Sequence, residues 1–260
     1  MATGITQAQI TEYVKKHIPD FHKERLEKLR KLKLQKVLSR KNPYLFKTKG
    51  LLTSRELVKA ILDAHLSSSE ETVLGGFLEG LAVFICGKVY GGGKSAANGI
   101  DLEFVKDRKK YFVSIKSGPN WGNSEQIKKL RMVFKEVRKI YGQDKNSLPV
   151  ECVNGCCYGK LKTTSEHKGD YIKLCGSRFW ALISGDENTY LNIVEPLGHE
   201  AKDRNTEFLA QYELVVDEFT ELFRTMFCDA GNNILWEKLT KFSSGPPTGE
   251  EVEDEITGEP

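Results

Sequence analysis

The chain has 260 residues, of which 39% are hydrophobic and 10% aromatic, and its formal net charge is +3. A chain of this size can bury a sizeable core, in one large domain or two small ones, without disulfide bonds. It has no run of about 18 apolar residues and no signal-peptide h-region, which argues against a membrane or exported protein. We therefore expect a cytoplasmic protein without membrane contact, whose six cysteines are reduced thiols or metal ligands.

Charge is distributed unevenly along the chain. Residues 1–50 contain 13 Lys and Arg against 4 Asp and Glu, whereas Gly249–Pro260 contains six acids and no base. The sequence predicts a basic helical arm at 1–50 and a disordered acidic tail at 243–260. The arm is either a solvated helical segment or a segment for DNA binding or dimerisation.

The first part of the chain has helical patterns. Apolar residues recur at helical spacing over residues 6–38 with an interruption near Pro19, so we predict two helices there. Thr53 followed by Glu56 is typical of a capping box and predicts a helix through about Leu62.

The segment "VLGGFLEGLAVFICG", Val73–Gly87, is apolar on nearly every side and predicts a buried helix, capped by the polar "SSSEE" before it. Its only charge is Glu79. A Gly-rich loop, "YGGGKSAANG", follows and leads into two β-type runs, "IDLEFV" and "YFVSIK", joined by the polar turn "KDRKK". These two runs are predicted to be adjacent strands.

Later elements complete the pattern. Ser124 is expected to cap a helix with one apolar face, and "LPVECV" is a predicted strand. Two apolar pieces, "FWALIS" and "LNIVEPLG", have no defined type, and helices are predicted at 206–226 and at about 233–242. Helix, strand, strand, helix and strand in that order predict an α/β core with helices on the faces of the sheet.

The two predicted strands contain side chains suited to catalysis. Asp101 and Glu103 share one face of the first strand, and Ser114 and Lys116 share one face of the second. Hydrolysis of a phosphodiester needs a hard divalent cation held by carboxylates, for which Asp101 is the obvious ligand. Lys116 can orient or deprotonate the attacking water, or stabilise the charge of the transition state. The alternative interpretation is an ordinary salt bridge between Asp101 and Lys116.

This pair of strands resembles a known signature. "GIDLEF" followed by "SIKSGPNWGN" is similar to the PD-(D/E)xK nuclease motif, an aspartate at the end of one strand and a (D/E)xK triplet on the next. With "KNPYLFKTKG", "LDAHLSSSEET", "KSGPNWGNS" and "VNGCCYG", the segment from about Lys41 to Gly198 resembles type II restriction endonucleases of the PmeII-like group, related to enzymes that cut interrupted GGNCC sites. The resemblance implies a restriction-endonuclease-like core with a central mixed β-sheet flanked by helices, a helical N-terminal arm, and a nuclease domain at residues 51–242.

By this resemblance Asp101 and Lys116 match the aspartate and the lysine of the motif, but Ser114 stands at its acidic position. A hydroxyl is a poor ligand for Mg²⁺, so a second acid has to come from elsewhere. Glu79 is the first candidate, because an unpaired charge in an apolar helix is costly and related nucleases place a glutamate on the helix before the motif strand. Glu103 is the second. The predicted catalytic residues are Asp101, Lys116, Glu79 and Ser114, and the predicted Mg²⁺ ligands, which also suit Mn²⁺, are Asp101, Glu79 and Glu103.

The turn "SGPNWGNS" and the helix after it offer donors and positive charge to DNA phosphates. The predicted contacts are Asn120, Asn123, Ser124, Lys128, Lys129 and Arg131. The alternatives are a plain tight turn and solvent-facing charges. Trp121 lies in the same turn, near the predicted site. For the reading of bases, we name Lys162, Lys168 and Arg178 in the second half of the chain.

Several cysteines and a histidine lie close together in the sequence. A structural zinc ion would be held by Cys152, Cys156, His167 and Cys175. The spacing differs from that of paired CxxC knuckles, so this set competes with the interpretation that these cysteines, and Cys157 beside them, are buried free thiols.

The function implied by the resemblance is a Mg²⁺-dependent type II restriction endonuclease that hydrolyses double-stranded DNA at an interrupted GC-rich palindrome and leaves 5′-phosphate ends. A two-fold symmetric site implies a homodimer, and the host-defence role implies a DNA methyltransferase in the same system. Two alternatives stay open. One is a structure-specific repair or junction nuclease of the same superfamily, and the other is an inactive nuclease-fold DNA-binding protein, because Ser114 breaks the triplet.

Overall fold

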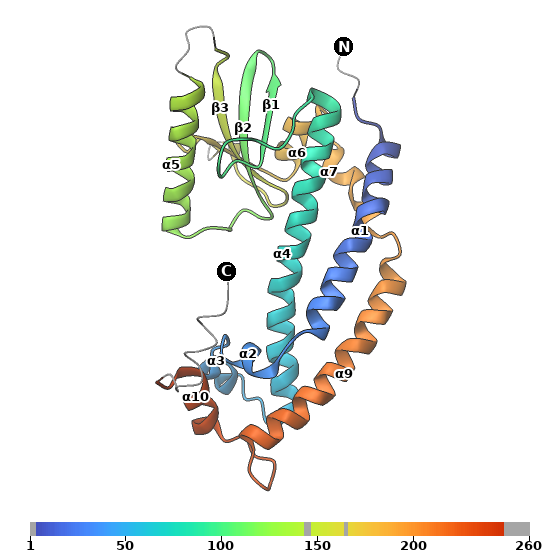
Figure 1. The fold of residues 1–260 in the computed structure, drawn as a ribbon, viewed down its shortest axis with the longest axis vertical. Coiled ribbons are helices and arrows are strands. Elements are labelled where there is room, and N and C mark those ends of the chain that lie inside the picture. The colour runs from blue at the N-terminus through green and yellow to red at the C-terminus, as the bar shows by residue number, and fades with distance from the viewer. Residues whose placement is uncertain (1–3, 143–146, 164–165, 247–260) are drawn as a thin grey trace. The chain divides into compact units, whose positions relative to one another are not determined.

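The computed structural model describes residues 4–142, 147–163 and 166–246 (Figure 1). Almost all of the predicted acidic tail lies outside these residues. Helices predominate in the described part of the chain, which contains a four-stranded sheet of mixed direction. The prediction of an α/β fold, with a central mixed sheet flanked by helices, is confirmed.

The chain divides into two compact units. Unit 1 combines Met1–Lys23 with Glu71–Lys202, and unit 2 combines Glu24–Glu70 with Asp203–Pro260. This division differs from the predicted arm and nuclease domain, because the basic N-terminal segment contributes residues to both units. A role of that segment in DNA binding or dimerisation stays a prediction.

The sheet lies in unit 1 and has the strand order β1-β2-β3-β4. Its strands are β1 Leu102–Lys106, β2 Lys109–Lys116, β3 Val150–Cys156 and β4 Ile172–Cys175. β1 and β2 are adjacent, as predicted, and they pair antiparallel around Asp107 and Arg108, whose φ values are 49° and 58°. Positive φ at both central residues is typical of a two-residue hairpin turn. The pairs β2–β3 and β3–β4 are parallel, and α5 (Ser124–Tyr141) connects β2 to β3.

The two faces of the sheet pack against different helices. Ile115 of β2 belongs to one core with Ile85 of α4 (Ser54–Tyr90), whereas Phe112 belongs to another with Phe134 of α5. Side chains alternate in direction along a strand, so these two residues point to opposite faces. Figure 1 shows α5 lying along the sheet. The direction of each polar side chain on β2 is therefore set by the apolar residues beside it.

Two helices are longer than predicted. α1 (Gln7–Arg30) continues through Pro19, where an interruption was expected. α4 is a single helix of 37 residues, so the predicted helix start at "SSSEE" is wrong. Apolar packing on both sides of each weak point outweighs local propensity. The buried residues that flank these two points are Ile18, Leu26, Leu66 and Val73.

Among the described residues, one helix, α4, is long and apolar enough to cross a membrane by length and composition alone. The core helix of a soluble protein meets the same criterion. Leu81 and Ile85 of α4 are fully buried in the core of unit 1, against β-strand residues. We therefore interpret the second half of α4 as a core helix.

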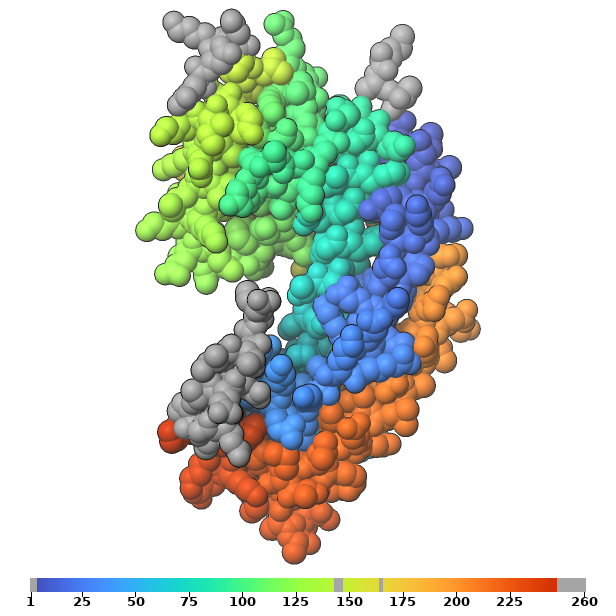
Figure 2. Space-filling model, in the orientation of Figure 1, coloured from blue at the N-terminus to red at the C-terminus, as the bar shows by residue number. Residues whose placement is uncertain are grey.

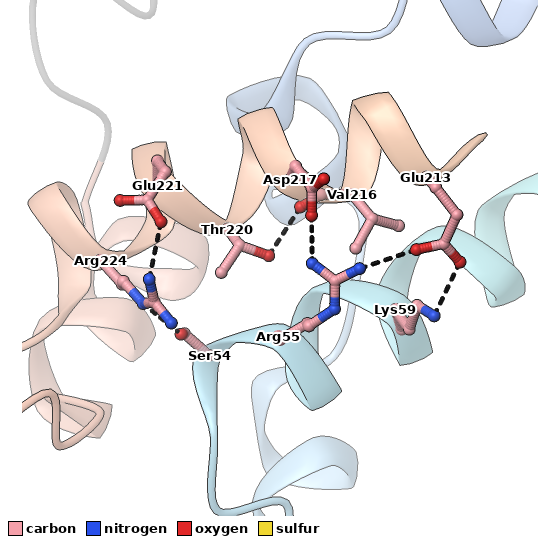
Figure 3. A network of polar contacts seen from close by, with 9 residues as sticks. All are labelled: Ser54, Arg55, Lys59, Glu213, Val216, Asp217, Thr220, Glu221 and Arg224. Carbon is pink, nitrogen blue, oxygen red and sulfur yellow. Dashed lines mark hydrogen bonds and ion pairs between the residues drawn. The ribbon is translucent and has the colours of Figure 1, made fainter. Parts of the chain in front are cut away.

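Unit 2 is helical. It contains α2 Leu34–Leu38, α3 Pro43–Thr48 and α10 Trp236–Ser244, together with parts of α1, α4 and α9 (Ala201–Phe227). A polar network joins the first turns of α4 to α9, and Figure 3 shows it. Arg55 contacts both Glu213 and Asp217, and the Lys59 ammonium lies 2.9 Å from Glu213. These pairs add polar contacts to the apolar packing between the two helices.

The apolar pieces of undefined type are short helices after β4. They are α6 Ser177–Ser184, α7 Thr189–Asn192 and α8 Val194–Leu197. Phe179 of α6 is fully buried, and an added Cβ at Gly155 of β3 would lie 2.4 Å from its ring. The glycine thus lets α6 pack directly on the strand.

Candidate active site

Asp101 lies directly before β1 and against β2. Its backbone N–H donates to the carbonyl of Val113 at 3.0 Å, which extends the antiparallel pairing by one residue. Its carboxylate accepts a 2.6 Å hydrogen bond from the backbone N–H of Ile115, and the hydroxyl of Ser114 lies 3.5 Å from the same oxygen. The aspartate is therefore held by the carboxyl-terminal half of β2.

Ser114 stands where the signature has an acid, and it is buried, with 2% of its surface exposed. Its hydroxyl faces Asp101, and its backbone carbonyl accepts a 3.2 Å hydrogen bond from the side-chain amide of Asn154 on β3. A carboxylate in the same place would bring two like charges together, which disfavours ionisation. Ser114 thus contributes a hydrogen-bond donor to Asp101 and no second acid.

Glu79 of α4 is half-buried and lies close enough to Asp101 for their charges to interact. Burial raises the pKa of the Glu79 carboxyl and the charge of Asp101 raises it further, whereas Lys94 and Lys116 lower it. Charges influence one another in this way only where they are close and partly shielded from water. We call Glu79, Lys94, Asp101 and Lys116 the charged cluster.

Lys116 is the last residue of β2. Its ammonium lies 5.4 Å from the centre of the Trp121 ring, which is a cation–π contact. Within residues 4–142, 147–163 and 166–246, no ion pair joins Lys116 to Asp101. The alternative interpretation, an ordinary salt bridge between these two residues, is therefore wrong for this structure.

Glu103, the second candidate acid, has other partners. One carboxylate oxygen accepts a 2.6 Å hydrogen bond from the Ser95 hydroxyl, and the other lies 3.2 Å from the Lys110 ammonium. Asp101, by contrast, raises the pKa of Glu79. The partners of Glu103 and the charge effect of Asp101 on Glu79 therefore favour Glu79 over Glu103 as the second acid.

Lys94 is a member of the charged cluster that the sequence analysis missed. It follows Gly93, whose N–H and carbonyl make hydrogen bonds of 3.0 and 2.9 Å with the backbone of Glu103. This antiparallel bridge runs the Gly-rich loop back along β1, which brings Lys94 toward Asp101. The one signal in the sequence was a single cation within "YGGGKSAANG".

A known protein family matches most of the chain. The model of the type II restriction endonuclease EcoO109I matches residues 8–205, which include the whole sheet and the charged cluster. The chain belongs to the type II restriction endonuclease EcoO109I family. A comparison with curated proteins gave no match. Membership makes the chain a nuclease whose substrate is DNA, and the fold described above is that of a restriction endonuclease.

In this member of the EcoO109I family, the turn before α5 differs from the prediction. Asn123, not Ser124, caps the helix, because its side chain accepts a 3.0 Å hydrogen bond from the N–H of Gln126. The Gln126 side chain accepts a 3.0 Å bond from the N–H of Asn123 in return, which completes a capping box. Figure 2 shows the surface that α5 forms on unit 1. All six predicted DNA contacts in this region are exposed: Asn120, Asn123, Ser124, Lys128, Lys129 and Arg131.

The three residues predicted to read bases differ in their exposure and in their contacts. Arg178 lies 2.5 Å from the carboxylate of Glu166, which is 4% exposed. The backbone carbonyl of Lys168 accepts a 3.5 Å hydrogen bond from Arg131, and Lys162 is exposed. Which residues of this endonuclease read bases therefore stays a prediction.

The zinc prediction is wrong for the described residues. Cys152, Cys156 and Cys175 are buried free thiols and His167 is exposed. In the part of the chain that the structure describes, no three His, Cys, Asp or Glu side chains are arranged to hold a metal ion. The physical reason is that β3 is extended, so Cys152 and Cys156 are about 13 Å apart along the strand. Burial also raises the pKa of Cys152 to about 11, which keeps this thiol protonated.

Proposed function

We propose that this EcoO109I family member is a Mg²⁺-dependent endonuclease of the PD-(D/E)xK type that cuts double-stranded DNA at a specific sequence. The observation that carries the proposal is the charged cluster at the carboxyl end of β2. Asp101 and Lys116 match the aspartate and the lysine of the motif, and Glu79 supplies the acid that Ser114 does not.

The residues of the cluster fit a hard divalent cation. Burial and then the charge of Asp101 raise the pKa of Glu79, so the two carboxyl groups repel each other when both are ionised, and a bound cation would relieve that repulsion. Mg²⁺ in enzymes is commonly held by one or two carboxylates together with waters and substrate phosphates, which suits Asp101 and Glu79. When bound, Mg²⁺ or Mn²⁺ neutralises charge on the phosphate and lowers the pKa of a water.

The other residues of the site have separate roles in the proposal. Ile115 and Ser114 hold the Asp101 carboxylate in one orientation through their hydrogen bonds. Lys116 orients the attacking water or stabilises the negative charge of the transition state. Lys94 adds a second positive charge beside the scissile phosphate. In-line attack by water leaves a 5′-phosphate and a 3′-hydroxyl, as the resemblance to PmeII-like enzymes implies.

For DNA binding, the proposal uses the exposed cations of α5 and the basic N-terminal segment. Lys128, Lys129 and Arg131 are suited to phosphate contacts, which carry no sequence information and weaken with salt. A homodimer presents two equivalent active sites to a two-fold symmetric DNA site. The resemblance points to an interrupted GC-rich palindrome as that site and to a DNA methyltransferase of the same system.

Digestion of a mapped plasmid tests the proposal. With Mg²⁺ we expect a small number of discrete bands whose sequenced ends carry 5′-phosphates, and no cleavage after EDTA removes the metal. Cutting that depends on branched or damaged DNA would identify a structure-specific nuclease instead. Binding without any cleavage in Mg²⁺ or Mn²⁺ would identify an inactive DNA-binding protein, the alternative that Ser114 motivates.

The Glu79→Gln variant should lose cleavage and gain stability. Loss of one of two carboxylates should lower the cleavage rate by roughly 10²-fold. Because the pKa of Glu79 is raised in the folded protein, its stabilising contribution is present at low pH and lost as pH rises through that pKa. At pH 8 without metal, Gln should therefore raise the free energy of unfolding, by no more than about 1 kcal/mol for a partly exposed, solvent-screened group. At pH 4 the two proteins should unfold alike.

Glu103→Gln is the matched control for this variant. Glu103 is held by Ser95 and Lys110, so its replacement should leave the cleavage rate near that of the parent. If Glu103→Gln abolishes cleavage and Glu79→Gln does not, the assignment of the second acid is reversed. Thermal unfolding in EDTA at both pH values and single-turnover cleavage provide the measurements.

A further inference from the structure

Trp121 is anchored in the turn between β2 and α5. Its indole N–H donates to the side-chain oxygen of Asn154 at 3.0 Å. Asn154 is 1% exposed, and its amide donates to the backbone carbonyl of Ser114 at 3.2 Å. Ser114 and Asn154 are register partners in the parallel pair β2–β3, so the asparagine is fixed within the sheet. The indole is thereby tied to both strands.

The anchored ring lies beside the ammonium of Lys116, 5.4 Å from ring centre to Nζ. Lys116 follows Ser114 by two residues, so both side chains leave the same face of β2, which is the face toward Asn154 and Trp121. A lysine side chain is flexible, and holding it in one place costs conformational entropy. A cation–π contact favours those rotamers in which the ammonium stays by the ring.

Packing alone does not account for this arrangement. Trp121 is partly buried against the core that contains Phe112 and Phe134, and any large apolar side chain could fill that space. The contact with Asn154 is different, because a buried amide is costly unless both its donor and its acceptor have partners. The acceptor of Asn154 is matched to the indole N–H, which sets the plane of the ring next to Lys116.

We infer that Trp121 is a positioning residue for cleavage: its ring, oriented by Asn154, holds the Lys116 ammonium at the carboxyl end of β2. The inference rests on the proposed function, in which Lys116 acts on the attacking water or the transition state. Trp121 makes no bond to substrate in this role. It determines where the ammonium is found when DNA is bound.

Two variants of Trp121 separate the ring face from the bulk of the side chain. Trp121→Leu should lower the single-turnover cleavage rate by about tenfold, at saturating DNA and Mg²⁺, with DNA affinity unchanged. Trp121→Phe keeps a ring face without the N–H, so it should retain an intermediate rate. If the Leu and Phe variants cut equally fast at equal melting temperatures, the side chain serves packing alone and the inference is overturned.

A spectroscopic measurement tests the contact without cleavage. The chain has three tryptophans, and the Trp121 indole N–H resonance is identified by its loss in Trp121→Phe. Lys116→Met should shift this resonance and leave those of Trp180 and Trp236 in place. An unshifted Trp121 resonance would overturn the inference. Trp236→Leu is the matched control, because Trp236 also lies beside a lysine: Lys47 Nζ is 4.9 Å from its ring centre. The Trp236→Leu variant should cut DNA at the parent rate.

Failure of this inference is distinguishable from failure of the proposed function. If Lys116→Met cuts DNA at the parent rate, the proposed function fails, and the positioning role fails with it. If Lys116→Met is inactive while Trp121→Leu cuts at the parent rate, Lys116 acts in cleavage and the positioning role alone is overturned.

Discussion

The Lys116→Met variant should bind DNA as tightly as the parent and cut it about 10²–10⁴ times more slowly. Methionine keeps an unbranched side chain that can pack on Trp121, but it carries no charge and no proton. The chemistry proposed for the end of β2 therefore disappears while the local packing stays. Single-turnover cleavage of a plasmid with Mg²⁺ measures the rate, and fluorescence anisotropy with labelled DNA in EDTA measures the affinity.

Lys110→Met is the control for a lysine lost from the same strand. Lys110 also lies beside aromatic rings, with its ammonium 5.0 Å from the Phe112 ring centre and 4.7 Å from that of Tyr141, and it pairs with Glu103 outside the charged cluster. Its replacement should cost less than about 1 kcal/mol of stability and leave cleavage near the parent rate. Equal loss of cleavage in both variants, or in neither, would show that the cluster is not the active site.

The central hairpin could be predicted from the sequence because its signals are local. "IDLEFV" and "YFVSIK" are rich in β-branched and aromatic residues, which favours two strands. The short polar turn between them favours a β-hairpin. Alternation along each strand then predicts which side chains share a face. The antiparallel pairing of β1 with β2, which brings Asp101 to Ile115, follows from these short-range features.

Helix boundaries could not be predicted in the same way. Pro19 and the polar "SSSEE" are sites where an isolated helix would end, yet α1 and α4 continue through them. Their continuation depends on burial of residues on both sides against partners far away in sequence, and local propensity contains no information about such partners. The N-cap of α5 could not be predicted from local propensity either. Asn123 and Ser124 are both good capping residues, and only the backbone geometry selects Asn123.

Some residues of the candidate site could likewise be predicted from the sequence, and others could not. Glu79 could be found because a lone carboxylate in an apolar helix needs a compensating partner, and Lys94 and Lys116 are the nearby cations that lower its pKa. Lys94 could not be found, because its position depends on a two-bond bridge between Gly93 and Glu103 that no sequence spacing indicates. The zinc set was one of two interpretations of these cysteines, and the extended form of β3 separates Cys152 and Cys156, which it required.

Asp101→Asn should reduce cleavage by roughly 10³-fold, because it removes the central metal-binding charge from the cluster. The substitution is nearly isosteric, and the Asn side-chain oxygen can still accept the hydrogen bond that the N–H of Ile115 donates. The fold and the hairpin should therefore persist. Loss of the Asp101 charge should also lower the pKa of Glu79, although burial continues to raise it. Cleavage measured over a range of Mg²⁺ concentrations should show that the variant needs more metal for any residual activity.

Asp107→Asn tests whether this effect belongs to Asp101 or to loss of any aspartate near the hairpin. Asp107 is exposed at the turn between β1 and β2 with a φ of 49°, a conformation that asparagine tolerates well. Its replacement should change neither stability nor cleavage. If Asp101→Asn cuts at the parent rate with an unchanged requirement for Mg²⁺, then Asp101 holds no catalytic metal. Its short bond to β2 is in that case a structural contact of the hairpin, and the source of nuclease activity lies elsewhere in the chain.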